Sequence, residues 1–349
     1  MSSLPYLTLS SHFTQYGVFL TLITNTLITN LTFSYVKNIT FAYKCLIGLQ
    51  AILGILFSLT EVLVHPFLHS YNASYIFFSA TFASNKWMLT GTLVLALYSL
   101  IYMNIICCLA IQFIYRYFVV VAPRSLAYFR GCKMLCWPFY IFVLMGIWVF
   151  SLVQNLPNGF SRSYLKGEIA RHYHADINYT PSFQIVACGI ESSRSRAIQG
   201  ILGFSSIILF QYIVILYCGI HIHLGIQSIA TLASARVHRM HNQLFKTLVL
   251  QITVPSIFYN SPVFFLYILP FLDLKWSVPS GVMICVFSFY PAFDSLILLW
   301  MVTEYNRTMR KLLYNMLSKV SQLLRSDDEE DSQEQSSKSR KPVNLAQLA

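Results

Sequence analysis

Ionisable side chains are rare within the long apolar runs of this 349-residue sequence, so each one is a candidate for function. Asp294 stands three residues after Pro291 in one such run. Proline frees a backbone carbonyl and kinks a helix, and a buried carboxylate beside it can bond to another helix or hold water. Asp294 and Pro291 are therefore predicted to form either a switch or a structural hydrogen-bond anchor.

Two further ionisable residues stand near the ends of apolar runs. Arg116, flanked by Tyr115 and Tyr117, is expected either to snorkel to the membrane interface or to contact a signalling partner. Glu61 is expected to reach water at the end of another run.

Aromatic and amide side chains at helical spacing suggest a small-molecule pocket. Tyr98 and Tyr102 are one turn apart, with Asn104 near mid-depth of the same run, and Tyr259 and Asn260 lie at mid-depth of a later one. A ligand pocket needs aromatic walls and a few polar groups. Aromatic residues make up 15% of the chain, however, and ordinary packing is the competing interpretation for each of them.

No pattern in the chain supports catalysis. The sequence lacks the phosphate-binding loop, the nucleophile elbow and the zinc-protease motif, and His238 and His241 have no carboxylate or cysteine near them in sequence. We therefore expect no enzyme activity, cofactor or metal. The net charge of +11 does not predict nucleic-acid binding, because the basic residues are scattered between apolar runs.

The elements that must position these residues are membrane-spanning helices. Hydrophobic residues make up 56% of the chain and charged residues only 11%, which rules out an ordinary soluble protein. A hydrocarbon core of about 30 Å needs about 20 apolar residues in helix. Seven runs fit: Tyr16–Val36, Tyr43–Val64, Trp87–Tyr115, Met134–Leu156, Ala197–Ile220, Thr247–Leu272 and Ser277–Thr303. The predicted fold is an all-α membrane protein, a seven-helix bundle over residues 16–303. Pro255 predicts a bend in the sixth helix, which makes that helix the candidate moving part.

Charge in the connecting loops predicts the orientation. With the N-terminus outside, the inner segments hold fourteen Lys and Arg residues and the outer segments seven. Inner loops carry the excess of positive charge, so the N-terminus is predicted outside and the C-terminus inside. The sequons at Asn72 and Asn178 then fall in outer loops, where they can be glycosylated.

The two ends of the chain differ from the bundle. Residues 1–15 are expected to form a short extracellular N-terminus. Residues 304–325 are predicted to form an amphipathic helix on the inner leaflet, because its apolar residues recur at helical spacing and alternate with cations that suit anionic lipid head groups. A soluble partner-binding helix is the alternative. Residues 326–349, rich in acidic residues and serine, are predicted to be a disordered cytosolic tail.

Four stretches resemble motifs of the nematode serpentine chemoreceptors of the Str class, the class that includes a diacetyl odorant receptor. They are Asn38–Leu46 at the start of the second span, His65–Ser70 after it, Phe113–Tyr117 at the end of the third, and Tyr290–Ser295 with Tyr305–Arg307 at the end of the seventh. Two positions depart from the family pattern: Ser295 stands where proline is expected, and Asn306 separates Tyr305 from Arg307.

The resemblance implies a G-protein-coupled chemosensory receptor of the olfactory type in the plasma membrane, in the cilium of a sensory neuron. Its partners would be a small odorant-like ligand, a heterotrimeric G protein and membrane lipids. Asp294 would match the family's aspartate in helix seven. The face toward the G protein would hold Tyr115, Arg116, Tyr117, Arg124, Arg236, Arg239 and Lys246.

Other membrane proteins remain alternatives. A small transporter would show internal repeats and paired broken helices, and no repeat is visible. A ligand-gated channel subunit of the inverted seven-helix kind would place the N-terminus inside, against the distribution of charge.

Overall fold

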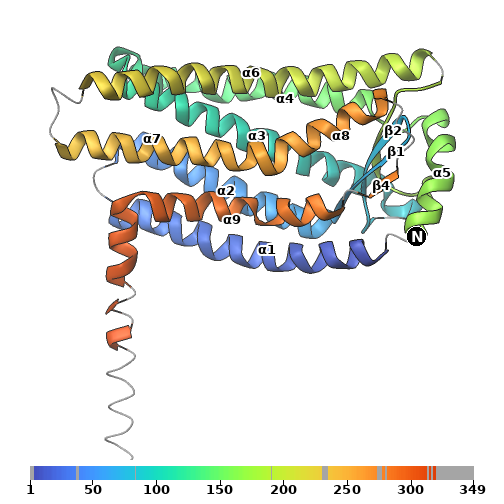
Figure 1. Cartoon of the computed structure of the whole chain (residues 1–349), viewed down its shortest axis with the longest axis horizontal. Coiled ribbons are helices and arrows are strands. Elements are labelled where there is room, and N and C mark those ends of the chain that lie inside the picture. Colours follow the sequence, from blue (N-terminus) through green and yellow to red (C-terminus); the bar gives the residue numbers. More distant parts are fainter. Residues whose placement is uncertain are drawn as a thin grey trace, which may run out of the picture.

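The computed structural model describes residues 4–36, 39–82, 84–189, 191–229, 235–272, 277–279, 281–312, 314–315 and 317–319. Long helices run side by side as a bundle, with a small sheet and a short helix across one end (Figure 1). We call this end the cap end and the opposite one the tail end. The expected tail, residues 326–349, lies outside the described part of the chain, as do the side chains of Arg236 and Tyr259.

The bundle helices occur in the expected order. Their bounds are α1 Leu4–Asn30 with a π-helical turn η1 Leu31–Tyr35, α2 Phe41–Val64, α3 Met88–Val120, α4 Cys136–Gln154, α6 Glu191–Ile229, α7 Ala235–Pro255 with a π-helical turn η5 Ser256–Asn260, α8 Ser261–Leu272, and α9 Gly281–Met301. Short 3₁₀ turns η2 Asn85–Trp87, η3 Pro123–Phe129 and η4 Gly131–Leu135 connect some of them. α1 begins at Leu4, earlier than the expected Tyr16, and Pro5 lies in its first turn, where a helix tolerates proline.

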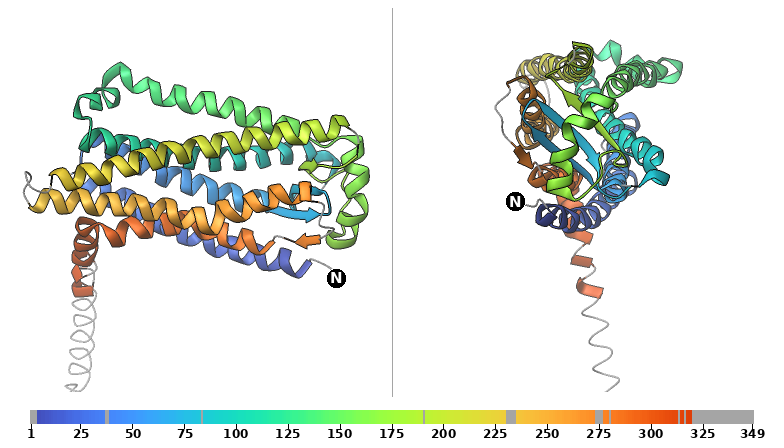
Figure 2. Two further views of the ribbon diagram at one scale, coloured as in Figure 1. Left: turned by 45° about the horizontal axis from the view of Figure 1, so that its top comes forward. Right: turned by 90° about the vertical axis from the view of Figure 1, so that its right-hand side faces the viewer.

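A four-stranded antiparallel sheet at the cap end was not predicted. Its strands are β1 Pro66–Tyr71, β2 Ser74–Ser79, β3 Ser182–Val186 and β4 Ser277–Pro279, in the spatial order β3-β2-β1-β4. Phe67 of β1 pairs with Phe78 of β2. The strands come from three separate loops between bundle helices and meet under α5, Gly159–Tyr173 (Figure 2). The fold is therefore mostly helical, with a cap at one end that consists of the sheet and α5.

Local chemistry explains how the cap begins and turns. Asn72 lies in the two-residue turn between β1 and β2 at φ 48°, a left-handed conformation that asparagine tolerates. Asn158 caps α5: its side chain accepts a hydrogen bond from Ser161 N at 2.7 Å, and Ser161 Oγ accepts one from Asn158 N at 3.0 Å. This reciprocal capping box fixes the start of α5 after the end of α4.

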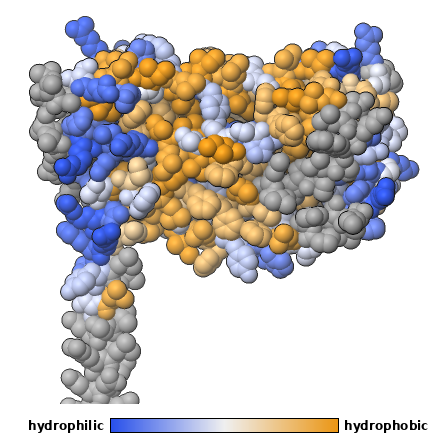
Figure 3. All heavy atoms as spheres, in the orientation of Figure 1, coloured by the Kyte–Doolittle hydropathy of each residue, from blue (hydrophilic) through white to orange (hydrophobic). Residues whose placement is uncertain are grey.

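The described residues contain six helices long and apolar enough to cross a membrane, and seven if α9 and the bent helix after it count as one span. Hydrophobic side chains cover the middle of the bundle, and hydrophilic ones gather toward its ends (Figure 3). Large apolar side chains such as Phe139 and Phe142 of α4 are mostly exposed. Exposed apolar surface of this extent suits lipid rather than water.

The chain turns sharply after α9. The helix Thr303–Lys319 makes an angle of 92° with Cys285–Met301. It therefore leaves the bundle axis, and Figure 1 shows it projecting sideways from the bundle at the tail end rather than continuing α9.

α1 and α9 pack especially closely. A Cβ added at Gly17 would lie 2.5 Å from the carbonyl oxygen of Ser288, closer than real Cβ atoms approach. Asn25 of α1 also donates a hydrogen bond to the carbonyl of Pro291 at 3.3 Å and accepts one from Ser295 Oγ at 2.9 Å. The helix bearing Asp294 is thus held against α1 by both shape and hydrogen bonding.

Candidate functional site

A cavity lies in the bundle directly under the sheet. Its volume is about 60 Å³, and it is lined by residues of the hairpin, α3, α4, α6, α8 and α9. The lining is mostly aromatic: Tyr75, Phe77, Tyr98, Tyr102, Trp148, Tyr267 and Phe287. Aromatic walls in a concave site at the centre of a bundle are typical of small-ligand pockets.

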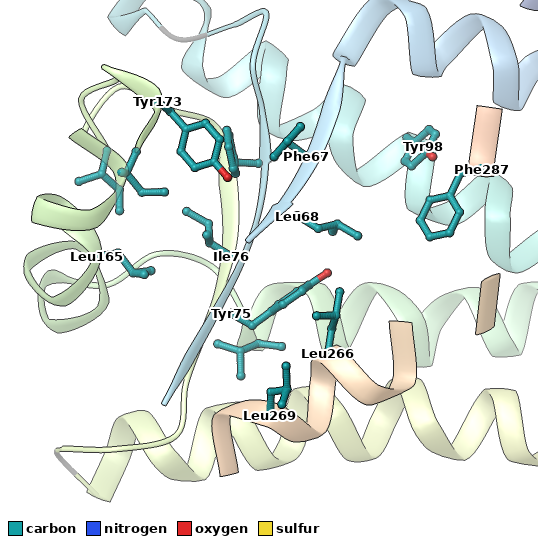
Figure 4. Packing of buried hydrophobic residues seen from close by; sticks show 14 of the residues in the cluster. Phe67, Leu68, Tyr75, Ile76, Tyr98, Leu165, Tyr173, Leu266, Leu269 and Phe287 are labelled. Carbon is teal, nitrogen blue, oxygen red and sulfur yellow. The ribbon is translucent and has the colours of Figure 1, made fainter. Parts of the chain in front are cut away.

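The hairpin contributes the wall nearest the cap. Figure 4 shows Tyr75 reaching from its strand toward Leu266 of α8, while Tyr98 and Phe287 lie near each other further into the bundle. The Tyr75 ring meets Tyr267 edge-on at 5.1 Å between centroids. Tyr98 stacks on Phe57 of α2 at 4.6 Å. These packed rings hold the walls of the cavity in place.

A chain of polar groups lies beside the cavity at mid-depth. Tyr102 donates a hydrogen bond to Asn260 Oδ1, and Asn260 Nδ2 donates to the hydroxyl of Tyr212 at 2.6 Å. The Tyr212 hydroxyl also lies 2.6 Å from Ser256 Oγ. The fold thus joins two of the five predicted pocket residues, Tyr102 and Asn260, from distant parts of the sequence.

Pro255 explains where this polar chain sits. Proline cannot donate the hydrogen bond that continues an α-helix, and the helix widens into the π turn η5 immediately after it. The wide turn carries Ser256 and Asn260 and so presents them to Tyr212 and Tyr102.

The other predicted pocket residues take different places. Tyr98 lines the cavity. Asn104 donates to the carbonyl of Leu100 on its own helix at 2.8 Å and is not part of the lining.

Two carboxyl groups are buried deep in the bundle. Asp294 is 7% exposed and lines a small cavity of about 10 Å³ together with Gln50, Gln112 and Gln251. Glu61, which was expected to reach water, is only 1% exposed. It accepts hydrogen bonds from Ser288 and from Thr14, the latter at 3.4 Å. That expectation was wrong, because α1 and α9 cover this side of α2.

The tail end holds a stacked group around Arg116. Its guanidinium lies 3.9 Å from the centroid of the Tyr43 ring, and Tyr43 stacks on Tyr115 at 5.3 Å. The Tyr115 hydroxyl hydrogen-bonds Thr40 Oγ1. Arg116 is 6% exposed, so it does not snorkel to the interface. A cation over a tyrosine face is attracted by the ring quadrupole, which stabilises the buried position.

Comparison with known proteins identifies the family. The model of the family described as "Serpentine type 7TM GPCR chemoreceptor Str" matches residues 10–310. The chain belongs to this family. It is 34% identical over 312 residues to "G-protein coupled receptor str-33" of Caenorhabditis elegans, covering 87% of this chain and 90% of that one. It is also 23% identical over 276 residues to "Serpentine receptor class r-10" of Caenorhabditis briggsae, covering 77% of this chain and 80% of that one.

The fold agrees with the family. Squid rhodopsin superposes with a TM-score of 0.57 at 13% sequence identity, covering 91% of this chain and 87% of that one. The expected seven-helix bundle is therefore confirmed, and membership of the chemoreceptor family confirms the expected non-enzymatic class.

The remaining predicted residues lie on the surface of the receptor. Arg124, Arg239 and Lys246 are exposed at the tail end, and Tyr117 is half-buried. Asn178 is exposed in the loop after α5, whereas Asn72 is half-buried in the hairpin turn.

Sequence reasoning missed a buried polar cluster in the cap. His69 Nε2 and His172 Nε2 each lie 3.2 Å from Glu168 Oε1, and His69 Nδ1 lies 3.0 Å from the Tyr173 hydroxyl. Burial lowers the pKa of His69 to about 4, against the opposing effect of the nearby Glu168 carboxylate. The signal available in the sequence was the spacing of Glu168 and His172, one turn apart on a polar helix.

Proposed function

We propose that this receptor detects a small environmental compound, which binds in the cavity under the sheet and is reported to a heterotrimeric G protein at the tail end. The observation that carries the proposal is the aromatic cavity with the Tyr102–Asn260 hydrogen bond at its edge. Aromatic walls and one polar pair suit a small, uncharged, odorant-like molecule.

The G protein is proposed to bind the tail end. This end presents the exposed cations Arg124, Arg239 and Lys246, close to the buried stack of Arg116 on Tyr43. The tail-end loops also carry most of the Lys and Arg residues, which favours the cytosol for this end and the exterior for the cap. The bent helix after α9 supports an amphipathic segment lying on the inner leaflet.

The proposed mechanism is a shift in population between two arrangements of the bundle. An agonist can favour the signalling arrangement only by as much as it binds that arrangement more tightly. The segment from α7 to α8 is the candidate moving part, because the π turn after Pro255 interrupts its helical hydrogen bonds beside the cavity. Asp294, in its hydrogen-bonded setting on α9, is proposed as an anchor or switch for the same change. Family membership further favours a sensory neuron's ciliary membrane as the site of action.

The test is a G-protein reporter assay in cells, with a panel of small volatile compounds as ligands. Ser99→Leu places a larger apolar side chain in the wall of the cavity and should raise the concentration for half-maximal response at least about tenfold. Leu97→Phe changes an exposed position on the same helix and serves as the control. Equal responses of the two variants would refute the pocket. Staining of tags at both ends, in intact and in permeabilised cells, tests the orientation.

A further inference from the structure

A groove runs along the outside of the bundle between α6 and the η5–α8 segment. Its volume is about 380 Å³. Ser205 lies on its α6 wall, and Ser261, Phe264 and Phe265 lie on its α8 wall. Ser261 is exposed, and the two phenylalanines are 50% and 51% exposed. The groove therefore opens on the apolar surface that faces lipid.

The groove and the cavity adjoin each other inside the bundle. Four side chains line both: Tyr102, Ile208, Val263 and Tyr267. The helices that form the two walls of the groove separate at Pro255. Before this residue α7 packs along α6, whereas after it α8 packs against β1 and β2.

Among the described residues, a packed layer of the cap lies between the cavity and the end of the molecule. Phe67, Ile76 and Phe78 of the hairpin are fully or almost fully buried. α5 covers the sheet from outside through Tyr173, whose ring centroid lies 5.4 Å from that of Phe67 and 5.0 Å from that of Phe78. A ligand entering through the hairpin and α5 would have to displace this packed layer.

The lining of the passage has a consistent chemistry. Among the described residues, no Asp, Glu, Lys, Arg or His side chain lines either the groove or the cavity. Its polar groups include the Tyr102–Asn260 pair at the junction of the two. A charged compound would lose its hydration there without a counter-charge, whereas an uncharged apolar compound would lose little.

We propose that the receptor takes up its ligand sideways from the membrane, through the groove between α6 and α8, and that the ligand class is uncharged lipophilic small molecules. The inference rests on the proposed ligand pocket. The membrane then concentrates the compound before it binds, and the groove excludes charged compounds.

A passage has a kinetic signature that differs from that of a binding contact. Narrowing it raises the barrier for uptake and for release equally, so both rates fall by the same factor and the dissociation constant stays the same. Ser205→Phe and Ser261→Phe narrow the groove from its two walls. Ser206→Phe is the matched control, since Ser206 is the next residue on α6, is exposed and does not line the groove.

The experiment uses the full chain in lipid nanodiscs and 1-naphthylamine, an uncharged fluorophore whose emission reports polarity. Stopped-flow fluorescence should show association and dissociation slowed by about tenfold or more in both narrowed variants, at unchanged dissociation constant. Ser206→Phe should match the wild type. The sulfonated analogue 4-amino-1-naphthalenesulfonate should not bind within the same time.

Each contrary outcome would refute a specific part of the proposal. Wild-type rates in both narrowed variants, or equally fast binding of the sulfonate, would refute uptake through the groove. A changed dissociation constant at an unchanged association rate would make the groove a binding site instead of a passage. If 1-naphthylamine binds without saturation, or binds Ser99→Leu as it binds the wild type, the proposed pocket itself fails.

Discussion

Acid is expected to weaken the cap through one buried histidine. His69 is fully buried in β1 and touches Glu168, His172 and Tyr173. Burial disfavours its protonated form and lowers its pKa from 6.5 to about 4. The Glu168 carboxylate acts in the opposite direction and His172 in the same direction, but burial is the largest effect.

The sign and size of the effect follow from proton linkage. In the unfolded chain His69 takes up a proton below pH 6.5, but in the folded receptor it does so only below about pH 4. Between these values the unfolded chain binds more protons, so the free energy of unfolding falls as the pH falls. The contribution of His69 to the free energy of unfolding is complete above pH 6.5 and declines as the pH falls toward 4. Below about pH 4 it no longer changes with pH. A pKa lowered from 6.5 to about 4 corresponds to roughly 3 kcal/mol.

The assay is thermal unfolding in nanodiscs between about pH 7.5 and about pH 4.5. His69→Gln cannot be protonated, so its stability should fall less over this range than that of the wild type, by roughly 2 to 3 kcal/mol. His174→Asn is the control, because His174 is exposed at the end of α5 at φ 53°, which asparagine also adopts. It should keep the full pH dependence. Parallel curves for wild type and His69→Gln would refute the reasoning.

Three further experiments test the packing and the surface. Gly17→Ala places a methyl group 2.5 Å from the Ser288 carbonyl oxygen and should lower the free energy of unfolding by about 2 kcal/mol or more. Gly146→Ala is the control in the same melting assay and should be neutral, because a Cβ at Gly146 has no atom within 4 Å. Glu61→Gln keeps an oxygen that accepts from Ser288, whereas Glu61→Leu removes the carboxyl acceptor of both Ser288 and Thr14 and should cost about 1 to 3 kcal/mol more; equal melting temperatures would contradict this. Asn178→Gln should abolish a glycosidase-sensitive shift on gels if the exposed loop carries the glycan, and an unchanged shift would point to the other sequons.

The sequence alone determined the bundle. A helix can cross the hydrocarbon only if about twenty successive residues are apolar, so each span is a local property of the chain and can be counted without any tertiary information. The same holds for the interruption of the helix at Pro255, since a proline in the interior of a helix removes one of its hydrogen bonds.

Only the tertiary structure decided the cap and the pocket. Ser182–Val186 is a strand because it pairs with residues 74–78, more than a hundred positions away, and a five-residue stretch carries no comparable local signal. Tyr102 and Asn260 meet only because η5 is wound wide and faces α3. Whether Glu61 reaches water or lies buried depends on which helices cover it, and that is a property of the packed bundle and not of its own segment.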